Sequence, residues 1–205
     1  MPAAQCAVML KGSRHNNYIG HSMPLPSVNA NIRLLGAVDF LMVSYFQQQL
    51  DYAYHGNGSV VIELTTCGGG AESARRMAAD VALFRKHSAN ELFFLGKATV
   101  YSAGTTFMAE FPNTHRYMAE GTLLMVHERR MVKQLALDGP TSSNIQIVRE
   151  VLSELETGRK LEMEAFEKLA AGSRISAAEI AEKARTEWYI TAGEALELGL
   201  IAGIV

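Results

Sequence analysis

Three features of the sequence carry groups that could perform acyl-transfer chemistry. Ser102 lies in KATVYSAGTTFMAEF, where an apolar strand gives way to a helix of small residues. His127 follows the apolar run TLLMV, and the glycine run 68–70 follows VVIELTTC. A serine hydroxyl needs a general base in contact before it is a useful nucleophile, and imidazole has a suitable pKa near neutrality. Glycine N–H groups, which no side chain shields, can bind the oxyanion that such an attack produces.

Each feature also has an ordinary structural explanation. Serine is among the best N-cap residues, so Ser102 could simply begin a helix. His127 precedes the charged residues ERR and could be a surface histidine, and the glycines could form a tight turn. A P-loop is excluded because no Gly-Lys-Ser/Thr follows the glycines, and a dinucleotide fingerprint has Ser73 in place of its third glycine. Only the three features together favour an acyl-transfer site.

Strands and helices alternate along the chain, which is typical of an α/β protein with a mainly parallel sheet. Phe40, Val43 and Leu50 recur at helical spacing, and a second helix is expected from residue 71 to about 87. We expect strands at IRLLG, VVIELT, ELFFLG, HRYMA, TLLMVHE, WYIT and IAGIV, and a short helix at AGEALELGL. In such a sheet the carboxyl ends of the strands share one edge, so Ser102, His127 and the glycines are expected to meet there.

A long helix is expected from about residue 143 to 171. Ser143 with Gln146, and Ser176 with Glu179, have the spacing of capping boxes that begin two helices. The long helix carries an apolar face, made of Ile145, Val148, Leu152 and Leu155.

Length and composition fit one domain of 205 residues with an irregular N-terminal arm at 1–30. The net charge of −2 argues against a nucleic-acid binder, and no apolar run reaches the length of a membrane span. No signal peptide is recognised, so a cytoplasmic location is expected. Cys6 and Cys67 are then expected to be free thiols. The six histidines are scattered, and neither a metal nor a cofactor is predicted.

The order of these motifs resembles that of the Clp protease proteolytic subunit family, within the crotonase-like superfamily. The resemblance covers residues 31–205 and is most specific in EWYITAGEALELGLIAGIV, which is similar to the family's closing segment. VVIELTTCGGG, SAGTTFMAE and LLMVHE match the family's glycine turn, its nucleophile helix and the strand that ends in its histidine. The resemblance implies a crotonase-like fold of repeated ββα/βα units with a protruding handle helix, here in a handle region at about 129–172.

The resemblance also implies roles for individual residues. Ser102 would be the nucleophile, His127 the general base and Glu187 the acid that orients the imidazole. The residues that would form and support the oxyanion hole are the N–H donors Gly69 and Ala103 and the loop glycines Gly68 and Gly70.

Several positions depart from the family pattern. Cys67 replaces a proline, and Glu187 stands where the family has aspartate, so Glu128 and Asp138 are kept as alternative acids. The usual Gln-Pro after the histidine is Glu128-Arg129.

The function implied is a serine peptidase that hydrolyses peptides or unfolded proteins inside a homo-oligomeric ring. A separate ATPase would be needed to unfold large substrates. Two alternatives stay open: a non-catalytic Clp-like scaffold subunit, and an acyl-CoA hydratase or thioesterase of the crotonase superfamily.

Overall fold

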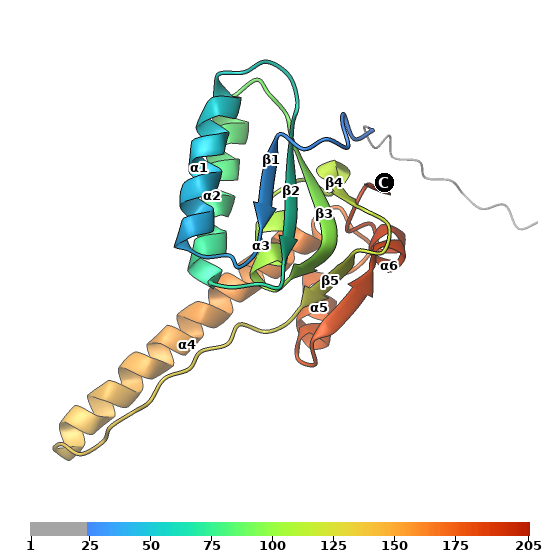
Figure 1. The fold of residues 1–205 in the computed structure, drawn as a ribbon. Coiled ribbons are helices and arrows are strands. Elements are labelled where there is room, and N and C mark those ends of the chain that lie inside the picture. The colour runs from blue at the N-terminus through green and yellow to red at the C-terminus, as the bar shows by residue number, and fades with distance from the viewer. Residues whose placement is uncertain (1–23) are drawn as a thin grey trace, which may run out of the picture.

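The computed structural model describes residues 24–205, which form one sheet with helices around it (Figure 1). The prediction for the arm at 1–30 and for Cys6 therefore falls largely outside the described residues. The strands are β1 Ile32–Leu35, β2 Val60–Thr66, β3 Leu92–Tyr101, β4 Arg116–Met118, β5 Leu123–Val126, β6 Trp188–Thr191 and β7 Gly203–Ile204. The helices are α1 Phe40–Tyr54, α2 Ala71–His87, α3 Ala103–Met108, α4 Thr141–Ala170, α5 Ala177–Ala184 and α6 Ala192–Glu197.

The sheet confirms the prediction of a mainly parallel arrangement. Its strand order is β1-β2-β3-β4-β7, and β5 pairs with β3 and with β6. Only the β5–β6 pair is antiparallel among the described strand pairs. The carboxyl ends of β2, β3 and β5 therefore lie at one edge, where the glycine run, Ser102 and His127 follow them.

The main core lies between the sheet and the helices α1, α2 and α3. Phe46 of α1 and Met77 of α2 are fully buried against the sheet residues Ile62 and Phe94. The predicted α1 pattern is wrong at one position, because Phe40 is 85% exposed although Val43 and Leu50 are buried. Phe40 is the first residue of α1, and the buried face of this helix is formed by Met42, Val43, Phe46 and Leu50.

The opposite face of the sheet carries a smaller apolar cluster. Four buried residues form it: Val61, Phe93, Leu95 and Tyr117. Leu25 and Ala30, which precede β1, pack against this cluster together with Ala202. The described end of the N-terminal segment thus lies on the sheet.

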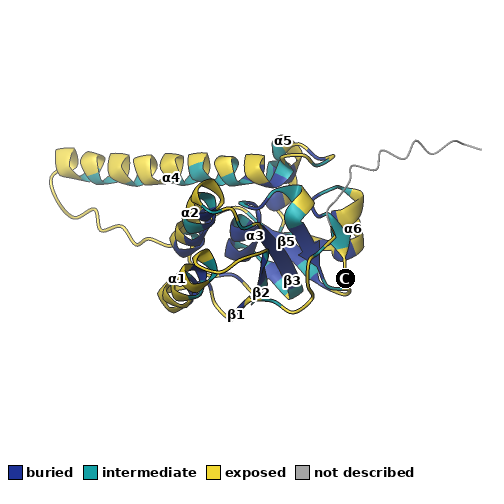
Figure 2. Cartoon of the chain, turned by 90° about the horizontal axis from the view of Figure 1, so that it is seen from above, coloured by how far each residue is buried: buried dark blue, intermediate teal, exposed yellow. Residues whose placement is uncertain are grey.

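Helix α4 extends away from the body, and the segment before it runs back along it (Figure 1). We call this segment, residues 128–140, the strap; it has no regular secondary structure. Of the 30 residues of α4 only Phe166 and Leu169 are buried, and Figure 2 shows the rest of the helix largely exposed. The predicted apolar face, at Ile145, Val148, Leu152 and Leu155, is therefore 46–52% exposed and does not pack on the core.

The two predicted capping boxes have different outcomes. Ser176 and Glu179 form one at the start of α5, with both reciprocal bonds present. The box predicted at Ser143 is wrong, because α4 begins two residues earlier, at Thr141, with Pro140 in the N-cap position. Proline fixes a φ that suits a helix start, so the helix begins as soon as the chain leaves Pro140.

Arg116 joins α4 to the body from inside the core. Its side chain is 1% exposed, and burial lowers its pKa to about 10, still well above neutrality. The guanidinium donates to five backbone carbonyls, those of Phe111 at 2.7 Å, Ala109 at 2.9 Å, Lys168 at 3.0 Å, Leu169 at 3.0 Å and Leu200 at 3.3 Å. Two of these carbonyls belong to the end of α4, so Arg116 holds that end of the helix in place.

No helix within residues 24–205 combines the length and the apolar character that crossing a bilayer requires.

Candidate active site

Ser102 occupies a sharp turn between β3 and α3. Its backbone has φ 54° and ψ −111°, a conformation that is strained for a residue with a side chain. The Ser102 N–H donates to the carbonyl of Met125 at 2.9 Å, and its carbonyl accepts from the N–H of Thr105 at 2.9 Å. These bonds hold the strained turn. A serine on a strained strand-to-helix turn is the arrangement of a nucleophile elbow.

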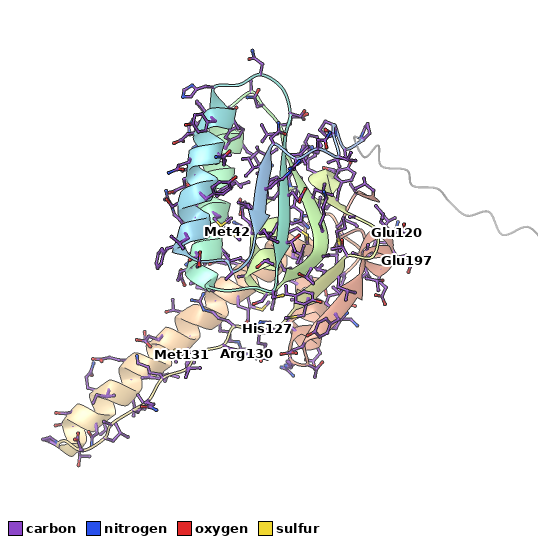
Figure 3. The ribbon with its side chains drawn as sticks, in the orientation of Figure 1. Met42, Glu120, His127, Arg130, Met131 and Glu197 are labelled. Carbon is purple, nitrogen blue, oxygen red and sulfur yellow. The ribbon has the colours of Figure 1, made fainter. Side chains whose placement is uncertain are left out.

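His127 and Ser102 are brought to the same edge of the sheet because the two strands that precede them are paired. β3 and β5 are parallel neighbours, with Tyr101 opposite Met125, so Ser102 and His127 follow adjacent strand ends. Both residues line one cavity of about 660 Å³. Figure 3 shows His127 where the chain leaves the sheet, with Arg130 and Met131 further along the strap.

The imidazole of His127 is held by the main chain. Its Nδ1 lies 2.5 Å from the carbonyl oxygen of Glu128. A carbonyl only accepts, so Nδ1 carries the proton and Nε2 is left as the basic nitrogen. That tautomer is the one a general base needs. Within residues 24–205 no hydrogen bond joins His127 to the Ser102 hydroxyl, a contact that is often long before substrate binds.

The glycine run lies against both Ser102 and the start of α1. A Cβ added to Gly68 would lie 3.0 Å from the Cβ of Ser102. Gly69 has φ 152° and pairs with Val38 in a parallel bridge, flanked by bonds from Val38 N–H to Gly68 and from Gly70 N–H to Val38. The loop therefore needs glycine at 68 and 69.

Two backbone N–H groups at this site are free. Across the described part of the chain, neither the N–H of Gly69 nor that of Ala103 has a hydrogen-bond acceptor. Both residues line the cavity that holds Ser102. Free N–H groups beside a candidate nucleophile are what an oxyanion hole requires.

We expect Gly69→Ala to lower reactivity at Ser102 by about 10²-fold. The added Cβ would lie 2.5 Å from the Val38 carbonyl oxygen, so the Val38–Gly69 bridge must open and move the amide. The rate of labelling by a fluorophosphonate would measure this. Gly70→Ala is the matched control, because Gly70 has an ordinary φ of −70° and its added Cβ would lie 3.2 Å from Ser73 Oγ and 3.5 Å from the Val38 carbonyl oxygen. Equal rates in both variants would contradict a role for the Gly69 amide.

Within residues 24–205, none of the predicted acids has its carboxylate hydrogen-bonded to the imidazole of His127. The Glu187 carboxylate forms an ion pair with Arg130, and Glu187 does not line the cavity. Glu187 also has φ 55°, which is uncommon for a residue with a side chain. Asp138 lies near the outer end of α4, since that helix begins at Thr141. Glu128 offers its carbonyl to His127 rather than its carboxylate.

Charged residues that sequence reasoning did not assign surround the cavity mouth. Arg129 pairs with Glu72, and its N–H donates to the Glu162 carboxylate. The Arg129 hydrogen bond, and a further bond from Arg75, hold the pKa of the Glu72 carboxyl below its usual value. The charged sequence HERR was a signal that the strap would carry cations beside the histidine.

The inner wall of the cavity is apolar and comes largely from α4. Val126, Phe166 and Leu169 are buried there, and Leu161 and Ala165 line it as well. Phe40 lines the cavity from the start of α1. The sequence did not reveal these wall residues, because they are distant in the chain from Ser102.

Cys67 is a free, exposed thiol at the edge of the same cavity, and its Sγ lies 4.0 Å from Thr99 Oγ1. Within the described residues, no group of three or more His, Cys, Asp and Glu side chains could hold a metal ion.

Comparison with known proteins shows the class of fold. A mutant of ClpP1 from Listeria monocytogenes superposes with a TM-score of 0.68 and 16% sequence identity, covering 85% of this chain and 90% of that chain. The chain therefore has the Clp protease-like α/β fold, which confirms the predicted fold class. No protein-family model matches the sequence, and no curated protein matches it either.

Proposed function

We propose that the protein is a serine peptidase that hydrolyses peptide bonds. The observation that carries this proposal is the convergence of Ser102, His127 and two free backbone N–H groups on one cavity. A fluorophosphonate or β-lactone probe tests it, because the first phosphonylates an activated serine with loss of fluoride and the second acylates it by opening of its ring. Mass spectrometry should find the adduct on Ser102.

In the proposed reaction the Ser102 hydroxyl attacks the peptide carbonyl while Nε2 of His127 takes its proton. The N–H groups of Gly69 and Ala103 bind the oxyanion that forms. His127 then protonates the leaving amine, and an acyl-enzyme ester remains on Ser102. Water, deprotonated by His127, hydrolyses the ester and frees Ser102.

Glu187 can act as the third member only if hydrogen-bond partners are exchanged. Its Oε1 contacts Arg130, and the Nδ1–H of His127 is bonded to the Glu128 carbonyl, so the imidazole has to exchange that carbonyl for the Glu187 carboxylate. Until it does, the Glu128 carbonyl performs the orienting role. The catalytic acid would then depend on movement of the strap, which carries Arg130.

We expect Glu187→Gln to lower peptide hydrolysis by about 10²- to 10⁴-fold, because a neutral amide stabilises the imidazolium poorly. Arg130→Gln should raise the rate several-fold, because it removes the competitor for Glu187. Lys133→Gln is the control, since Lys133 lies on the same strap but pairs with Glu154 of α4, and it should leave the rate unchanged. If Glu187→Gln keeps the wild-type rate, Glu187 only binds Arg130 and is no part of the catalytic group.

We further propose that the protein works as a homo-oligomeric ring on unfolded polypeptides in the cytoplasm, with a separate ATPase for large substrates. The support is the fold together with the exposed apolar stripe of α4. The strap adds exposed apolar side chains, among them Val132 at 98%. An apolar surface on both the helix and the strap is suited to a contact between copies.

A non-catalytic scaffold is the second candidate. The Glu187–Arg130 pair favours it, because the predicted acid is engaged elsewhere. Protein that assembles but is inert to every serine-directed probe would support the scaffold and contradict the peptidase.

A further inference from the structure

Three large apolar side chains are exposed in the seven residues that run from the end of β1 to the start of α1. Leu35 is 81% exposed, Phe40 85% and Leu41 80%. We call these three residues the apolar shelf. Single exposed apolar residues are common on proteins, but a cluster beside a candidate site indicates a binding surface.

The apolar shelf is fixed to the candidate active site by backbone hydrogen bonds. The N–H of Val38 donates to Gly68 at 3.0 Å, and the N–H of Gly70 donates to Val38 at 2.7 Å. Asp39 then caps α1 by accepting from Met42 N–H at 2.9 Å. The two residues before Phe40 are therefore fixed by hydrogen bonds, Val38 to the glycine run and Asp39 to the first turn of α1.

The shelf is also continuous with the cavity, because Phe40 lines it together with Ser102. In Figure 1 α1 begins at the end of the sheet where β1 finishes, which is the edge that carries the site. The cavity is also lined by Glu72, Arg75 and Arg129, which are charged and paired with one another. A bound chain thus has both apolar surface and paired charges to contact at this site.

We propose that Phe40 and Leu41 bind an apolar side chain of the polypeptide substrate, a few residues from the scissile bond. This rests on the proposed peptidase function. A peptide with its carbonyl at Ser102 advances about 3.3 Å per residue, so a residue within a few positions of the bond reaches the shelf. A substrate is favoured over a second copy of this chain because one end of the surface opens into the reaction cavity.

Two fluorogenic peptides with the same scissile residues test this, one with leucine and one with serine at the flanking positions. Phe40→Ser should raise KM for the leucine peptide at least about tenfold and leave its kcat unchanged, because burial of an aromatic ring is lost. The serine peptide and the rate of labelling by a small fluorophosphonate should not change. Tyr52→Ser is the control, since Tyr52 is 78% exposed on the same helix and does not line the cavity.

The other outcomes separate the two proposals. Wild-type protein that neither labels at Ser102 nor cleaves either peptide refutes the peptidase, and the substrate surface with it. Normal labelling with an unchanged KM in Phe40→Ser refutes the surface alone. If Phe40→Ser instead lowers the particle mass in light scattering and slows both peptides equally, the shelf is a contact between copies.

Discussion

Ser102→Ala is expected to lower kcat/KM for peptide hydrolysis by on the order of 10⁴-fold or more, and to abolish labelling by a fluorophosphonate. The hydroxyl oxygen of Ser102 is the atom that forms the acyl-enzyme in the proposed reaction. His127→Ala should cost a similar factor, because the serine and its base act as one unit. The double variant should therefore be little slower than either single variant.

Two exposed residues provide controls for this experiment. Ser142→Ala lies in the first turn of α4, and His87→Ala lies at the end of α2, both outside the cavity. Both should keep the wild-type rate. Equal labelling of wild type and Ser102→Ala would show that another residue reacts, and the assignment of the nucleophile would fail.

Arg116→Met is expected to lower the free energy of unfolding by about 3–5 kcal/mol. Replacing a buried charge by an apolar side chain removes its desolvation penalty, and in some proteins this gain exceeds the interactions that are lost. In this protein the partners of Arg116 are five backbone carbonyls, which methionine would leave buried without donors. We therefore expect the loss of these hydrogen bonds to destabilise the protein by more than removal of the desolvation penalty stabilises it.

Urea denaturation would measure the change, and the midpoint of thermal unfolding should fall by on the order of 10 °C. Arg116→Lys should give an intermediate loss, because it keeps the charge but has one nitrogen instead of three. Arg85→Met is the control, since Arg85 also donates to a carbonyl, that of Glu110, but at the surface. A loss below about 1 kcal/mol in Arg116→Met would show that water or a shifted side chain replaces the guanidinium.

Much of the local structure could be read from the sequence, because local rules decide it. The predicted helix at 71–87 and strand at 60–65 agree with α2 and with β2, which extends one residue further, and the Ser176 capping box forms as expected. Side-chain periodicity and caps depend on residues a few positions apart. The Ser143 box failed because Pro140, three residues earlier, supplied a better start.

The candidate site was predictable as far as strand order fixes it. A parallel sheet brings strand ends together, so Ser102, His127 and the glycine run were expected at one edge, and they line one cavity. The partner of Glu187 was not predictable in this way. Arg130 and His127 are three residues apart on the same segment, and only the path of the strap decides which of them Glu187 meets.

The sequence by itself determined the elements, the parallel sheet and the placing of a hydroxyl, an imidazole and free amides at neighbouring strand ends. Only the tertiary structure decided that the apolar face of α4 is exposed, that Phe40 borders the cavity and that Arg116 is buried among carbonyls. The physical reason is that burial depends on how elements distant in the chain pack. The same side chain can pack in the core, form a binding surface or hydrogen-bond several elements to one another, according to what lies against it.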